Sequence, residues 1–76
     1  MDKPFKYFTV QNPLPNGAEV LAVKQLQYNH ATVVCNLRHN EVTPFVTWAV
    51  DENSDAYWGH YFKTYDEAME DWRERA

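Results

Sequence analysis

The most constraining feature of this sequence is a short amphipathic helix pattern near its C-terminus. Thr64 followed by Glu67 forms a capping-box pattern, in which each side chain can satisfy a backbone N–H of the other residue. An apolar stripe at helical spacing overlaps it, formed by Tyr65, Ala68, Met69 and Trp72. Because such a stripe has to be buried, we expect a helix over residues 64–75 that packs against another element.

Four short runs with strand character precede this helix, at residues 18–28, 31–39, 44–50 and 56–62. The run 31–39 alternates most clearly, whereas helical spacing can also be drawn through 18–28. Polar turns separate the runs, at Asn29-His30, at 40–43 and at 51–55, and such short connections favour antiparallel hairpins. We therefore predict an α+β fold, an antiparallel sheet of about four strands covered on one face by the single C-terminal helix.

A chain of 76 residues has room for one domain, so we treat 1–76 as a single domain. Residues 1–17 form its N-terminal part, with a strand or ordered arm at 5–10 and loop chemistry at 11–17. No apolar run approaches the ~20 residues that span a bilayer, and no apolar signal segment opens the chain. These features predict a cytoplasmic protein that does not enter a membrane.

Strict alternation along the strands assigns their side chains to two faces. The face expected under the helix carries Leu21, Val23, Val33, Cys35, Leu37, Trp48 and Trp58, packed on Met69 and Trp72. The face expected to stay open carries Thr32, Asn36, Arg38, Thr47, Tyr57 and Tyr61. Gly59 lies inside a strand, which predicts an aromatic ring, from Trp48 or Tyr65, lying across it.

The open sheet face is the predicted binding surface, since Tyr and Arg are enriched at interfaces. We expect its contacts to come from Arg38, Thr47, Tyr57 and Tyr61, beside an acidic flank of Asp66, Glu70, Asp71 and Glu74. A structural interpretation stands beside this one. Tyr and Thr favour strands in any case, and the acids can pair within the helix, as Glu70–Arg73 and Asp71–Arg75.

The net charge of −4 is unevenly distributed along the chain. Residues 1–40 hold two acids against four bases, and residues 41–76 hold nine acids against three bases. The acidic half disfavours a general nucleic-acid surface, because affinity for phosphates comes largely from Lys and Arg. Three alternatives remain open: a nucleic-acid-binding module that uses sheet aromatics, an acidic helix that imitates nucleic acid, and a homodimer.

The sequence contains no pattern that predicts catalysis or a cofactor. It has no Gly-rich phosphate loop, nucleophile elbow or HExxH motif. His30, His39, His60 and Cys35 match no metal-site spacing. Cys35 lies in the middle of a strand, where we expect a buried and unreactive thiol. The chain is therefore interpreted as a protein without enzymatic activity, metal or cofactor.

Residues 45–72, FVTWAVDENSDAYWGHYFKTYDEAMEDW, resemble a group of small uncharacterised proteins from phages, plasmids and integrative elements. Those proteins share a V-x-W strand, an acidic turn, a YWGHYF-like strand and a short acidic helix. The group has no established activity, so no catalytic residue carries over. The resemblance implies an accessory protein of a phage or mobile element that binds and occludes a host protein, such as a component of host defence.

Overall fold

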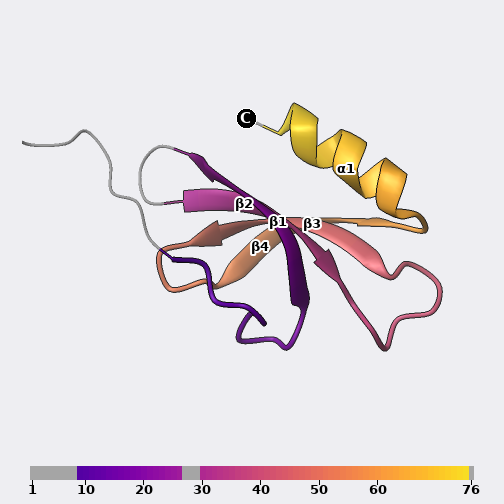
Figure 1. The fold of residues 1–76 in the computed structure, drawn as a ribbon, viewed down its shortest axis with the longest axis horizontal. Helices are drawn as coiled ribbons and strands as arrows, with labels where there is room; N and C mark the ends of the chain where they lie inside the picture. The colour runs from indigo at the N-terminus through magenta and orange to yellow at the C-terminus, as the bar shows by residue number, and fades with distance from the viewer. Residues whose placement is uncertain (1–8, 27–29, 76) are drawn as a thin grey trace, which may run out of the picture.

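The computed structural model describes residues 9–26 and 30–75. It contains strands β1 (Glu19–Leu26), β2 (His30–Asn36), β3 (Phe45–Asp51) and β4 (Ala56–Phe62), followed by helix α1 (Tyr65–Glu74). The strands form one antiparallel sheet in the order β1-β2-β3-β4. The predicted α+β fold is confirmed: α1 packs on the sheet (Figure 1). The predicted N-terminal strand at 5–10 and the turn residue Asn29 lie mostly or wholly outside the described residues.

One face of the sheet is covered by the segment 10–18, and we call it the loop face. Its buried strand residues are Ala31, Val33, Cys35, Val46, Trp48 and Val50. Leu14 and Ala18, each 2% exposed, pack on this cluster from the segment. Burying a side chain such as Leu14 stabilises a fold by about 1.5–3 kcal/mol before entropy is counted, so the loop is an integral layer of the core.

The opposite face lies beneath α1, and we call it the helix face. Its buried residues are Thr32, Val34, Thr47 and Ala49, with Ala68 buried from the helix. Trp72 donates its indole N–H to the Thr32 carbonyl at 3.1 Å. The Lys24 ammonium donates to the carbonyls of Trp72 (3.0 Å) and Arg75 (2.8 Å), a favourable place for a cation because helix C-termini carry partial negative charge.

The helix therefore covers the face that was expected to stay open, and that prediction is wrong. β2 and β3 are apolar in both directions, with Val33 and Val34 each 0% exposed, so alternation does not reveal which face takes the helix. The turn-rich segment 10–18 supplies the apolar cover for the loop face. The helix then takes the face on which Thr32 and Thr47 present hydrogen-bonding groups to Trp72 and Asp71.

Two bulges, one in each edge strand, also break the strict alternation. In β1 the register shifts between Val20 and Ala22. In β4 the register with β3 shifts between the pairs Thr47–His60 and Ala49–Tyr57, so the bulge lies at Trp58. An extra residue moves the side chains beyond it to the other face. Tyr57 consequently pairs with Ala49 on the helix face, whereas Tyr61 pairs with Val46 on the loop face.

The β3–β4 turn ties the N-terminal segment to the sheet. The Asp51 carboxylate accepts the backbone N–H groups of Asn53 (2.9 Å) and Asp55 (3.1 Å). This brings Ser54 to a positive φ of 65° and buries it. The Ser54 hydroxyl accepts the N–H of Gln11 at 3.0 Å, so the turn and the segment that covers the loop face hold each other in place.

Helix α1 begins after Thr64, as its cap pattern predicts. The Thr64 hydroxyl accepts the N–H of Glu67 at 3.2 Å and donates to the Glu67 carboxylate at 3.1 Å. This is half of a capping box, because the Glu67 carboxylate accepts from the hydroxyl of Thr64 and not from its backbone N–H. In the part of the chain that the structure describes, no helix has the length and apolar character that crossing a membrane requires.

Candidate functional site

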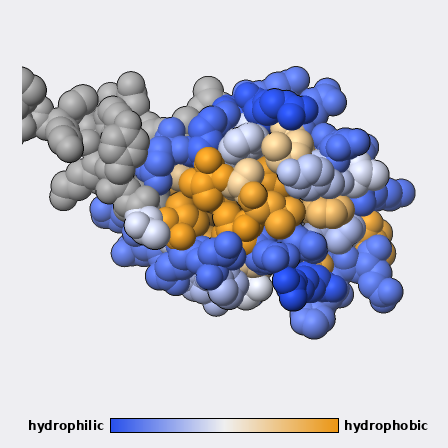
Figure 2. All heavy atoms as spheres, viewed as in Figure 1, coloured by the Kyte–Doolittle hydropathy of each residue, from blue (hydrophilic) through white to orange (hydrophobic). Residues whose placement is uncertain are grey.

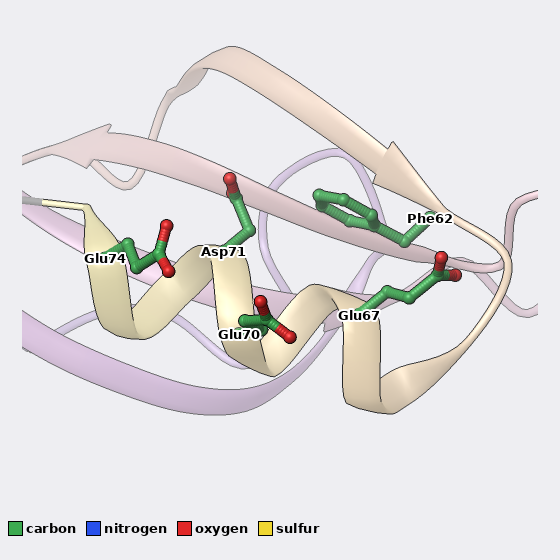
Figure 3. A pocket seen from close by; sticks show the side chains of 5 residues that line it. All are labelled: Phe62, Glu67, Glu70, Asp71 and Glu74. Atoms are coloured by element: carbon green, nitrogen blue, oxygen red, sulfur yellow. The ribbon is translucent and has the colours of Figure 1, made fainter.

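An acidic groove runs between β4 and α1. It has a volume of about 320 Å³ and is lined by Phe62 from β4 and by Glu67, Glu70, Asp71 and Glu74 from α1. The four acids lie at helical spacings i, i+3, i+4 and i+7, which place side chains on one side of a helix. Figure 3 shows Phe62 above the helix, with the Asp71 carboxylate directed toward the strands. Glu67, Glu70 and Glu74 are exposed.

Asp71 is the centre of the hydrogen-bond network that joins the helix to the sheet. Its carboxylate accepts the Thr47 hydroxyl of β3 at 2.5 Å and lies 3.0 Å from Nδ1 of His60 on β4. It also accepts the Nε–H of Arg75, the C-cap residue that follows α1, at 3.3 Å. One carboxylate thus contacts two strands and the C-cap of α1.

These contacts change the acidity of Asp71. Burial by itself raises the pKa of a carboxyl group, but the hydrogen bonds from Thr47, His60 and Arg75, together with the charge of His60, lower it. The net result is a pKa below the ordinary aspartate value. The hydrogen-bond network therefore favours the charged carboxylate form of Asp71.

Trp58 projects from the bulge in β4 next to this network. Its side chain is 77% exposed, and its backbone adopts a positive φ of 55°, which is uncommon for a residue other than glycine. The Trp58 carbonyl accepts Nη2 of Arg75 at 2.5 Å. Its ring packs edge-on against Tyr57, with ring centres 5.0 Å apart. The bulge leaves a large aromatic side chain exposed to solvent, while Tyr57 contacts its ring and Arg75 binds its carbonyl.

We call the surface formed by Tyr57, Trp58, His60 and Phe62 of β4 with Glu67, Glu70, Asp71 and Glu74 of α1 the β4–α1 face. Of the predicted binding residues, it brings together Tyr57, Glu70, Asp71 and Glu74. Thr47 is fully buried beneath the helix, so the prediction that it lies on an open sheet face is wrong. Tyr61 lies on the loop face, edge-on to Trp48 at 6.3 Å.

The remaining predicted residues lie apart from the groove lining. Arg38 pairs with Glu19 at 2.9 Å and is largely exposed. Asp66 is exposed in the first turn of α1. Sequence reasoning missed Trp58, which it placed under the helix, and also His60 and Arg75 as part of a site. The available signal was Gly59, since a glycine inside a strand often marks a bulge.

The chemistry of the remaining groups is limited. Burial raises the pKa of the Cys35 thiol to about 12, so this side chain is a poor nucleophile near neutral pH. Across residues 9–26 and 30–75, no group of three or more His, Cys, Asp or Glu side chains is arranged to hold a metal ion. The β4–α1 face combines groove carboxylates beside Phe62 with the exposed Trp58, whose carbonyl is linked to Asp71 through Arg75. Carboxylates and aromatic rings are suited to binding a cationic, partly apolar surface.

Comparison with protein-family models, with curated protein sequences and with solved structures gave no match.

Proposed function

We propose that this chain is a non-enzymatic module that binds a partner protein through the β4–α1 face and occludes the surface it covers. The observation that carries the proposal is the conformation of Trp58. A large aromatic side chain is left 77% exposed on a backbone with φ 55°. Such a conformation costs about 1–3 kcal/mol and is found preferentially at functional sites.

Trp58 has the properties of an interface anchor. Tryptophan is enriched among the few residues that dominate binding energy, and its rigid ring loses little entropy on contact. The edge contact with Tyr57 and the Arg75 hydrogen bond to its carbonyl restrain Trp58 before a partner arrives. Restraint of this kind reduces the ordering cost of association.

The acidic groove favours a positively charged partner surface. Glu67, Glu70 and Glu74 are exposed along it. Among the described residues, the basic side chains that pair with the groove lining are His60 and Arg75, and both pair with Asp71. Complementary charge raises the rate of association and selects against acidic partners. The same charge opposes binding of nucleic acid, which would bring phosphates next to carboxylates.

The resemblance of residues 45–72 to proteins of phages and mobile elements supports a biological setting for this proposal. Small accessory proteins of such elements often act by binding a host protein. We therefore propose a host protein as the partner, with a component of host defence as the first class to examine.

Affinity capture from a bacterial host lysate tests the proposal, with the immobilised chain as bait and mass spectrometry as readout. We expect a protein that is retained by the wild type and lost with Trp58→Ala, because removing an anchor of this kind weakens binding by about 30-fold or more. Val42→Ala is the matched control, since Val42 is also exposed, at 71%, but lies outside the β4–α1 face.

Two outcomes would overturn the proposal. One is capture of the same proteins by the wild type and by Trp58→Ala. The other is micromolar binding of single-stranded oligonucleotides in fluorescence anisotropy at low salt that is lost when Tyr57 and Tyr61 are changed to Ala, which would identify a nucleic-acid-binding module.

A further inference from the structure

The turn that leads into β1 contains an Asn-Gly pair, Asn16 followed by Gly17. The Gly17 N–H donates to the Leu14 carbonyl at 2.7 Å, which closes a β-turn. The Asn16 side-chain oxygen accepts the N–H of Ala18 at 3.0 Å, as asparagines in turns commonly do. The segment that carries this turn lies along the lower edge of the molecule in Figure 1, where Figure 2 shows mainly hydrophilic side chains.

An asparagine side chain can react with the backbone nitrogen of the residue that follows it, which is one reason why asparagine is thermolabile. The nitrogen attacks Cγ and forms a C–N bond, the bond from Cγ to Nδ2 breaks, and ammonia leaves with the backbone amide proton. The cyclic imide that remains takes up water and opens to aspartate or to isoaspartate, in which the main chain runs through the side-chain carbon. Water is the only co-reactant.

The structure around Asn16 favours this reaction. Asn16 and Gly17 are both exposed, and a Cβ at Gly17 would meet nothing within 4 Å, so the turn is open to solvent there. Glycine has no Cβ and adopts many backbone conformations readily. The Ala18 N–H already contacts the Asn16 oxygen, which becomes negatively charged during the attack, and a donor at that position stabilises the charge.

One hydrogen bond opposes the reaction. The Gly17 nitrogen can attack only after its N–H leaves the Leu14 carbonyl. A bond of this kind slows a step that has to break it by roughly two- to tenfold. The β-turn therefore slows the reaction in the folded chain but does not prevent it.

We propose that Asn16 is a site of spontaneous modification, at which the folded chain converts asparagine to aspartate and isoaspartate in water. Isoaspartate lengthens the main chain between Leu14 and Ala18. The Leu14 N–H donates to the Ala18 carbonyl at 3.0 Å across this turn, and the Gly17 N–H donates to the Leu14 carbonyl. The longer chain disrupts both bonds, and it loosens the hold of segment 10–18 on the loop face, where Leu14 is buried.

Incubation of the full chain in mildly alkaline buffer, followed by peptide mapping with mass spectrometry, tests this proposal. The readout is the mass difference between amide and acid at each asparagine. Asn53 is the matched internal control: it is also exposed, and the N–H of the next residue, Ser54, donates to the Asp51 carbonyl at 2.9 Å. Because Ser54 is buried and carries a Cβ, we expect Asn16 to convert at least about tenfold faster than Asn53.

Gly17→Ala should slow conversion at Asn16 to about the rate at Asn53. The comparison is repeated in urea, where the folding of the variant does not matter. Isoaspartate-containing chains, separated by ion exchange, should unfold at a lower urea concentration than the unmodified chain. Equal conversion at Asn16 and Asn53 in the folded wild type, conversion at Asn16 in urea alone, or conversion that Gly17→Ala leaves unchanged would overturn the proposal. An isoaspartate form as stable as the unmodified chain would overturn the effect on segment 10–18.

Discussion

The indole ring of Trp48 lies directly against the backbone of Gly59 on the neighbouring strand. A Cβ atom on Gly59 would lie 2.5 Å from Nε1 and 2.8 Å from Cδ1 of that ring. Trp48 belongs to the loop-face core and contacts Tyr61 edge-on, so it has little space to move away. The absence of a side chain at residue 59 is what lets the core tryptophan cross β4.

Gly59→Ala should therefore destabilise the fold by about 1–3 kcal/mol, the usual cost of overpacking a core. Urea unfolding followed by tryptophan fluorescence measures the loss. Gly17→Ala is the comparison: a Cβ there meets nothing within 4 Å, and only its φ of 92° opposes the change. We expect the near-UV circular dichroism of Trp48 to change with Gly59→Ala alone. An unchanged stability for Gly59→Ala would contradict the packing described.

Asp71 makes stability depend on pH in the acid range. Its pKa is lowered in the folded chain, so the stabilisation is complete above the unfolded value of about 3.9 and is lost as pH falls through the folded value. Asp71→Asn should lower the free energy of unfolding near neutral pH by about 1–2 kcal/mol. It should also make that free energy depend less on pH in the acid range. Thermal unfolding at several pH values measures both. Asp66→Asn, an exposed change in the same helix, should leave the pH dependence of the free energy of unfolding in the acid range as in the wild type.

Two replacements of Trp58 should differ in stability but not in binding. Glycine adopts a positive φ without strain, so Trp58→Gly should be more stable than Trp58→Ala by about 1 kcal/mol. Both variants lose the exposed ring and should lose the captured partner alike. Urea unfolding compares their stabilities. Equal stability of the two variants would show that the φ of 55° at this residue carries no strain in solution.

Thr32 should tolerate loss of its hydroxyl. The Thr32 Oγ1 atom is buried and has no hydrogen-bond partner among the described residues, although the Thr32 carbonyl accepts the Trp72 indole. Replacing an unsatisfied hydroxyl by a methyl group removes a desolvation cost, so Thr32→Val should stabilise the protein by about 1 kcal/mol. Thr47→Val is the contrast: it removes a hydrogen bond to Asp71 and should destabilise. Thermal unfolding distinguishes the two, and a destabilised Thr32→Val would indicate a partner for that hydroxyl.

Local patterns in the sequence were enough to predict the elements. The strands and the helix lie within a few residues of the predicted ranges, because turn residues, alternation and the Thr64 cap act over a few positions of the chain. The ring across Gly59 and the i,i+4 pair of Asp71 with Arg75 were predicted for the same reason and are confirmed. Cys35 is buried as its mid-strand position indicated.

Tertiary structure decided which face the helix covers and where the candidate site lies. β2 and β3 are apolar on both sides, so burial favoured neither face until segment 10–18 covered one of them. The bulge at Leu21 reversed alternation without a local signal, and Gly59 was the one local sign of the bulge at Trp58. Asp71 meets Thr47 across 24 residues of chain, and Trp72 meets Thr32 across 40. Contacts at such separations depend on how the layers pack, which periodicity within each strand or helix does not encode.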